Sequence, residues 1–168
     1  MLRKLFGIGK DNQEAHLKDL GLEFESMEQA QSHFNDYRTK KLKQLEELAE
    51  TSEIFTPTYE AKSLIGLETL YHDIYLAKNT KEVIPQSEFK ELINYYNAAV
   101  FIHYGLGEWQ VQEGLFSENK YVDGILYGYG SWSNLSYAEK IDKGNKKRDS
   151  LFKEFMMYIP EEEEHKYL

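Results

Sequence analysis

The chain has 168 residues, 41% of them hydrophobic and 14% aromatic, with a formal net charge of −9 at pH 7 and no cysteine. This length and hydrophobic content indicate one domain with a sizeable core and exclude a disordered chain. The acidic balance argues against binding nucleic acid through its phosphates, and the lack of cysteine excludes disulfides, thiolate zinc sites and cysteine nucleophiles.

The N-terminus, MLRKLFGIGK, is a short basic amphipathic segment. Leu2, Leu5 and Phe6 share one helical face beside basic residues, as in a small interfacial anchor. So few apolar side chains give only marginal membrane affinity, so we expect residues 1–10 to dock on the domain or to fray. A weak peripheral membrane contact is the alternative, which would suit an architectural domain recruited to a membrane.

The rest of the chain is expected to form a single helical domain, residues 11–160. It is followed by EEEEHKYL, residues 161–168, an acidic tail expected to be mobile because its like charges repel. No stretch approaches the ~18 apolar residues of a membrane span, and the apolar piece at the N-terminus is too short for a secretory signal. We therefore expect a cytoplasmic protein.

Apolar residues at steps of three and four predict three long helices, at about residues 26–51, 58–78 and 87–104. Ser26 begins the first with the capping-box sequence SMEQ, and Thr56 before Pro57 is a start signal for the second. Ser87 caps the third, which Gly105 closes. The second and third helices are apolar around most of their surface, so we expect them to pack together as the core.

The next stretch, residues 107–117, is predicted to be a short helix, and YVDGILYGYGSWSN follows it at residues 121–134. As a strand, each face of this glycine-rich stretch would mix residue types. As a helix, Gly124 and Gly128 would form a groove for a neighbouring helix, although interior glycines cost ~1 kcal/mol each relative to alanine. A helix is favoured, and a β-hairpin is the alternative.

Helical spacing resumes at Leu135, Ala138 and Ile141, and a last helix around residues 151–159 ends at Pro160. The stretch NLSYAEKIDKGN resembles the second helix and exit turn of a tetratricopeptide repeat. That family requires recurrence at ~34 residues, and no earlier segment repeats the pattern. The resemblance implies antiparallel helix pairs and no function.

The expected fold class is therefore mostly all-α, as a single-domain bundle or a short stack of antiparallel helix pairs. The alternative is an α+β fold with a small hairpin near residues 120–132.

Catalytic motifs do not stand out. The glycines lack the Lys-Ser/Thr ending of a phosphate-binding loop, and Ser131 lacks the following x-Gly of a nucleophile elbow. His72 stands four residues after Glu68, which favours a hydrogen bond at a half-exposed surface over a metal site. We expect no catalytic residue, no metal and no cofactor, and favour a role other than that of an enzyme.

The acidic balance and the 13 tyrosines favour a protein-binding module whose partner has a basic surface, such as a neutralising protein of the immunity or antitoxin kind. The candidate binding residues are Tyr95, Tyr96, His103, Trp109, Tyr127 and Trp132. Among the aromatic residues near the glycines, core positions are favoured for Tyr129 and Trp132. The alternative function is a small ligand-binding or enzymatic helical bundle, with a cavity lined by Tyr71, Tyr75, Tyr95, Tyr96 and His103.

Overall fold

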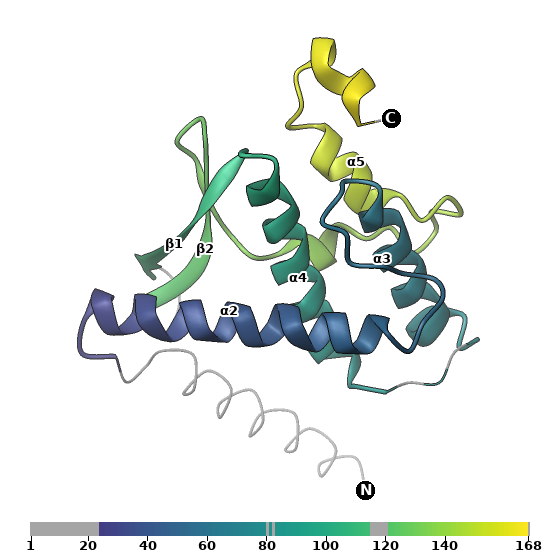
Figure 1. Ribbon diagram of the computed structural model, residues 1–168, viewed down its shortest axis with the longest axis horizontal. Helices are drawn as coiled ribbons and strands as arrows, with labels where there is room; N and C mark the ends of the chain where they lie inside the picture. The colour runs from purple at the N-terminus through teal and green to yellow at the C-terminus, as the bar shows by residue number, and fades with distance from the viewer. Residues whose placement is uncertain (1–23, 80, 82, 115–120, 168) are drawn as a thin grey trace, which may run out of the picture.

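The computed structural model describes residues 24–79, 81, 83–114 and 121–167, and it shows a mixed α+β fold (Figure 1). Within these ranges the elements, in chain order, are α2 (Met27–Ala49), α3 (Ser63–Tyr71), the π-helix η2 (His72–Leu76), α4 (Gln86–His103), β1 (Gly107–Glu113), β2 (Tyr121–Tyr127), β3 (Trp132–Asn134), the 3-10 helix η3 (Tyr137–Lys140), α5 (Ser150–Met156) and the 3-10 helix η4 (Glu161–Lys166). The three strands form one antiparallel sheet in the order β1-β2-β3. The expectation of a mostly all-α bundle is therefore wrong, and the α+β alternative is observed.

The long helix α2 begins where its capping sequence predicts. Ser26 Oγ accepts a hydrogen bond from Gln29 N at 3.2 Å, and Gln29 Oε1 accepts one from Glu25 N at 3.0 Å. These side chains satisfy backbone donors that the first helical turn leaves free. In Figure 1, α2 runs along one side of the molecule, with the sheet over its N-terminal part and α4 over its middle.

Helix α3 begins at Ser63, so the start signal at Thr56 and Pro57 was misleading. Two backbone N–H groups before Ser63 donate hydrogen bonds to tyrosine hydroxyls instead of to a helical turn. Tyr59 N donates to Tyr96 Oη of α4 at 3.0 Å, and Ala61 N donates to Oη of Tyr104, the residue after α4, at 3.2 Å. Tyr59 itself has a φ of 60°, which no helix contains. Hydrogen bonds to these distant tyrosine hydroxyls therefore determine the backbone conformation here, and the local start signal at Thr56 and Pro57 does not.

Helix α4 confirms the third predicted helix, although Pro85 rather than Ser87 precedes its first turn. It ends as expected, because Gly105 takes the positive φ of 70° that a helix-terminating glycine adopts. Its buried side chains join those of α3 and α5 in one core. Those with no exposed surface are Phe89, Leu92, Ile93, Tyr96, Asn97, Ala98, Val100 and Phe101. Both α3 and α4 therefore line the core, as predicted.

The predicted helices at 107–117 and 121–132 are wrong, because residues 107–113 form β1, residues 121–127 form β2 and residues 132–134 form β3. Alternate residues of β2 face the interior: Tyr121, Asp123, Ile125 and Tyr127 are all buried. Asp123 is the one charged residue on this face, and it pairs there with an arginine 85 residues away. The other face carries the half-buried Val122 and Leu126, so both faces contain apolar residues and the sequence lacks the alternation typical of a strand.

Gly124 makes room for a neighbouring strand and not for a helix. It pairs with Asn134 of β3, and a Cβ atom at Gly124 would lie 2.4 Å from Ser133 O and 2.6 Å from Trp132 Cζ2. No side chain fits there, so the glycine lets Trp132 lie flat across β2.

The C-terminal part is less helical than its spacing predicts. Leu135 and Ile141 flank only the short 3-10 helix η3, so the segment that resembles a tetratricopeptide repeat does not form that family's helix. Helix α5 confirms the last predicted helix, although it ends at Met156 and does not reach Pro160. In the acidic tail, the Tyr167 ring lies 5.0 Å from the ring of Tyr104.

Two expectations about the ends of the chain stay predictions. Residues 1–10 lie outside the described residues, and the mobility of the tail at 161–168 is a matter for measurement. Within the described ranges, no helix is both long and apolar enough to cross a membrane. A cytoplasmic location also stays a prediction.

Gly124→Ala distinguishes the sheet from the predicted helix, because it should lower the free energy of unfolding in a sheet and raise it in a helix. In the sheet, the added methyl group meets Ser133 and Trp132, and we expect the free energy of unfolding to fall by about 1–3 kcal/mol. In a helix, the same change would stabilise the protein by about 1 kcal/mol.

Gly128→Ala is the matched control, because the nearest atom to its Cβ would be Leu106 O at 3.9 Å. Urea denaturation of the three proteins measures both changes. A Gly124→Ala protein as stable as the wild type, or more stable, would contradict the sheet.

Candidate functional site

Three groups of polar or aromatic side chains stand out in the described residues. The first is a buried ion pair between α2 and β2, the second is a polar network around Glu68, and the third is a cluster of tyrosines at the turn between β2 and β3. Their exposure decides which of them a partner could reach.

The ion pair joins Arg38 to Asp123, whose side chains are each 5% exposed. Arg38 Nε donates to Asp123 Oδ2 at 3.0 Å, and the guanidinium lies 4.7 Å from the centre of the Trp109 ring. Gly124 N donates to Asp123 Oδ1 at 3.0 Å, and Arg38 Nη1 donates to Asn35 Oδ1 at 2.7 Å. Burial raises the pKa of Asp123, while the arginine opposes this rise. The donors and acceptors are satisfied internally, so the pair fixes the sheet on α2 and offers no group to a ligand.

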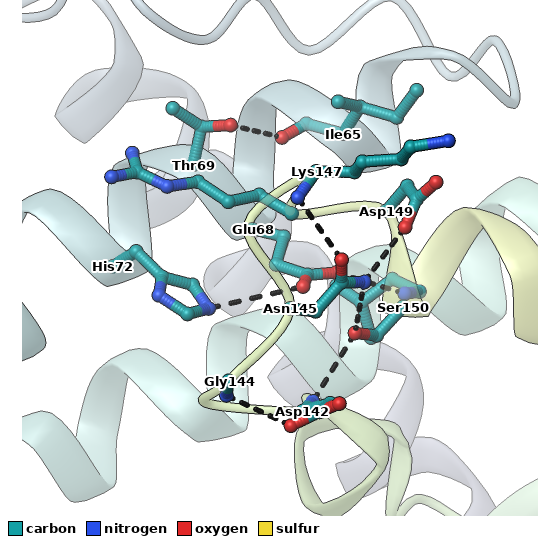
Figure 2. A network of polar contacts seen from close by, with 12 residues as sticks. Ile65, Glu68, Thr69, His72, Asp142, Gly144, Asn145, Lys147, Asp149 and Ser150 are labelled. Atoms are coloured by element: carbon teal, nitrogen blue, oxygen red, sulfur yellow. Dashed lines mark hydrogen bonds and ion pairs between the residues drawn. The ribbon is translucent and has the colours of Figure 1, made fainter.

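The network around Glu68 joins α3 to α5, and η2 to the loop before α5 (Figure 2). Glu68 is fully buried; its Oε2 accepts a hydrogen bond from Leu151 N at 2.9 Å, and its Oε1 lies 3.8 Å from His72 Nε2. Next to them, Arg148 Nη1 donates to Asp73 Oδ1 at 2.6 Å. Glu68 and His72 are therefore neighbours, as the spacing suggests, but both are buried rather than half-exposed, and 3.8 Å is too long for a hydrogen bond.

The loop in the same network is held by its own side chains. Asn145 Nδ2 donates to Asp149 Oδ1 at 2.7 Å, and Gly144 N donates to Asp142 Oδ1 at 2.8 Å. The interaction with Asn145 lowers the pKa of Asp149. Across the described part of the chain, no three His, Asp or Glu side chains are arranged to hold a metal ion. The network orients α3 and α5, and Glu68 has no surface exposed to a substrate.

Two of the predicted binding residues, Tyr95 and Trp109, cover the buried ion pair. Tyr95 is 5% exposed, and its ring lies 6.1 Å from the ring of Trp109 and 5.8 Å from that of Tyr37. Burial raises the pKa of Tyr95. Trp132 lies across β2, and its Nε1 donates to Gln110 O at 3.3 Å. These residues are placed to stabilise the sheet.

Tyr96 and His103 lie elsewhere on α4. Tyr96 is fully buried, and its hydroxyl lies 2.7 Å from Ser63 Oγ. His103 is exposed at the C-terminal end of the helix. The other two tyrosines expected to line a shared cavity, Tyr71 and Tyr75, lie with their rings 5.4 Å apart. Tyr71 Oη accepts a hydrogen bond from Gln86 Nε2, and Tyr75 Oη donates one to Ile84 O. The structure therefore does not bring the predicted residues together in one site.

The tyrosine cluster forms where the turn between β2 and β3 meets the end of α5. The rings of Tyr127 and Tyr129 are stacked 5.5 Å apart, and the ring of Tyr158 lies 4.8 Å from that of Tyr127 and 6.2 Å from that of Tyr129. Tyr127 is buried and shares a hydrogen bond of 2.6 Å with the hydroxyl of Tyr137. Tyr129 is 67% exposed, so a position in the core, as its spacing suggested, is wrong.

Burial has a strong effect on the hydroxyls of this cluster. It raises the pKa of Tyr127 and of Tyr137 well above the usual value near 10, and it raises the pKa of Tyr158 to about 12. The close packing of the hydroxyls contributes, because one phenolate would repel another.

Sequence reasoning named Tyr127 and missed Tyr129, Tyr158 and the neighbouring Met157, which is 79% exposed. The sequence YGYG at residues 127–130 could have indicated that Tyr129 is exposed, because it suits a tight turn between two strands. Nothing in the sequence shows that residues 127 and 158 meet. We call the group of Tyr127, Tyr129, Met157 and Tyr158 the tyrosine surface.

The raised pKa values predict a delayed ionisation of tyrosine. An unperturbed phenol ionises near pH 10, whereas Tyr158 should ionise near pH 12 and Tyr127 and Tyr137 only at higher pH or on unfolding. The folded state holds these protons more tightly than the unfolded chain does. Their contribution to stability is therefore complete below pH 10 and is lost as the pH rises through the folded values.

Absorbance at 295 nm against pH, recorded together with circular dichroism, measures this. Tyr158→Phe should remove about one tyrosine from the step near pH 12. If all 13 tyrosines ionise in one step near pH 10 while the protein stays folded, the described packing of the cluster is wrong.

Comparison with known proteins gives one match. The profile of a protein family with the description "Uncharacterised protein YwmA" matches residues 23–159, most of the chain. No curated protein and no solved structure matches the chain significantly. On the strength of the family match, the chain belongs to the YwmA family.

Proposed function

We propose that the protein binds another protein through the tyrosine surface. The observation that carries this proposal is the exposure of Tyr129 and Met157, at 67% and 79%, beside the half-buried Tyr158. Tyrosine and methionine are both enriched in the cores of protein interfaces. Tyrosine supplies a large contact area with little loss of conformational entropy and offers a hydroxyl for a hydrogen bond.

The tyrosine surface is held in place before a partner arrives. Tyr127 fixes it from beneath, because its ring also packs 5.6 Å from the ring of Phe101 and its hydroxyl bonds to Tyr137. Tyr158 lies 5.0 Å from the same phenylalanine ring. A surface that is ordered in advance loses less conformational entropy on binding, which favours affinity.

The charge around this surface supports a basic partner. Glu161–Glu164 follow Pro160 directly, so four carboxylates come within six residues of Tyr158 in the sequence. Glu154 acts on the hydroxyls of Tyr137 and Tyr158 by its charge. With a net charge of −9, the protein would attract a basic surface at long range, and an arginine or lysine side chain could then lie against the exposed tyrosine rings.

Substitution at the surface tests the proposal. Tyr129→Ala combined with Met157→Ala should leave the fold intact, because both side chains are mostly exposed. It should weaken binding of the partner by 10-fold or more, as loss of an aromatic hot spot does. Val83→Ala is the control, because Val83 is 65% exposed and belongs to the segment before α4.

The partner is first identified as a protein retained from the native organism by the wild type and by Val83→Ala, but not by the double variant. Titration calorimetry with the purified partner then gives the dissociation constants. Glu161–Glu164→Gln should also slow association at low salt, with less effect at high salt. Equal affinity of the double variant and the wild type would overturn the proposal. So would the absence of any protein that distinguishes the double variant from the control.

A further inference from the structure

An apolar groove lies at the C-terminal end of α2, far along that helix from the sheet. It encloses about 290 Å³. Leu48 of α2, together with Leu70 and Ile74 of α3 and η2, forms its floor, while Ile54 and Val83 line its edge. Ile54 is 39% exposed and Val83 is 65% exposed, so the edge presents aliphatic carbon to solvent. This groove takes no part in the tyrosine surface.

Carboxylates gather beside the groove at the C-terminal end of α2, where they are unfavourable for the stability of that helix. Glu47 and Glu50 lie in the last turn of α2 or just after it, and the last turn contains no basic residue. Glu53 lines the groove together with the polar Thr51 and Ser52 and one basic residue, Lys81. Carboxylates near a helix C-terminus are repelled by the helix dipole. Glu47 pairs with Lys43 at 3.6 Å, whereas Glu50 and Glu53 make no ion pair with any described residue. With Glu50 and Glu53 unpaired at this helix end against the single Lys81, the carboxylates outnumber the basic groups, so a basic segment would be stabilising at this place.

We propose that the N-terminal residues 2–6 of the same chain, LRKLF, occupy this groove. The segment matches it in both respects. Leu2, Leu5 and Phe6 fall on one face at helical spacing and supply the apolar side chains, while Arg3 and Lys4 between them supply the positive charge for the glutamates beside the groove.

The chain is long enough to reach. The described part begins at Phe24, whose ring packs 6.0 Å from that of Phe34 near the N-terminal end of α2. Helix α2 has 23 residues and is therefore about 34 Å long, which separates Phe24 from the groove. Phe6 lies eighteen positions before Phe24 in the sequence, and eighteen residue steps span about 27 Å as a helix and about 60 Å when extended. The required distance lies between these two values.

Attachment to the same chain also explains why so short a segment suffices. Three apolar side chains bind weakly when they arrive from another molecule or insert into a membrane. A segment tethered to its own site has an effective concentration in the millimolar range, so a weak contact is well populated. The groove therefore favours its own N-terminus over a second copy.

Disulfide trapping tests the proposal, because the natural chain has no cysteine that could interfere. Gly7→Cys places a thiol beside the segment without removing a contact residue, and Val83→Cys places one at the edge of the groove. With mild oxidation at low protein concentration, we expect an intramolecular disulfide to form at least about 10-fold faster than in the matched control Gly7→Cys with Met157→Cys. Met157 lies just after α5 and is 79% exposed. Non-reducing electrophoresis and mass spectrometry of the linked peptides give the rates.

A third protein carries the trapping pair together with Leu5→Asp and Phe6→Asp, and its trapping rate should fall to that of the control. Three results would overturn the proposal. They are equal rates in the trapping pair and the control, a linked dimer that forms faster than the internal disulfide, and fast trapping that persists in the aspartate variant. Added vesicles of phosphatidylcholine and phosphatidylserine should leave the trapping rate unchanged; if they abolish it, the segment prefers a membrane and the proposal fails.

Discussion

The buried ion pair between Arg38 and Asp123 sets the position of the sheet on the helices. Removing two charges from water is costly, and the pair offsets this cost only because several hydrogen bonds and the Trp109 ring surround it. Since Asp123 lies on β2, the pair fixes which face of that strand meets α2. Tyr127, four residues further along β2, is thereby directed to Phe101, and the turn that follows is brought to Tyr158. The tyrosine surface therefore depends on an interaction at the other end of the strand.

The parts of the fold that sequence reasoning predicted are those specified by local interactions. Helix α2 has its capping box, α4 has its terminating glycine, and both have regular apolar spacing; all of these signals act within a few residues. The sheet was mispredicted because its signals are long-range. Asp123 is polar on a buried face, and only its distant partner Arg38 explains this burial. Gly124 suggested close packing of helices, but in the structure it makes room for Trp132 of the neighbouring strand. The start of α3 was misplaced because hydroxyls of α4 accept the backbone donors that a helical turn would use.

The candidate site was less predictable than the fold. Of the residues proposed from the sequence, Tyr127 belongs to the tyrosine surface, while Tyr95 and Trp109 enclose the ion pair and Tyr96 is in the core. Aromatic content alone does not separate these roles, because tyrosine serves equally in a core and at an interface. Exposure separates them, and exposure follows from the meeting of a strand turn with a helix end about thirty residues away. The family match extends over both segments and adds no activity to this picture.

A double-mutant cycle on the free energy of unfolding tests most directly whether the ion pair holds the sheet in place. Arg38→Met alone leaves the Asp123 carboxylate buried and unpaired, and the account predicts a loss of about 3–5 kcal/mol. With Asp123→Val added, most of that loss should be recovered, whereas Lys43→Met, at an exposed pair, should cost less than about 1 kcal/mol. A small effect of Arg38→Met, or single effects that simply add in the double variant, would contradict the central role of this pair.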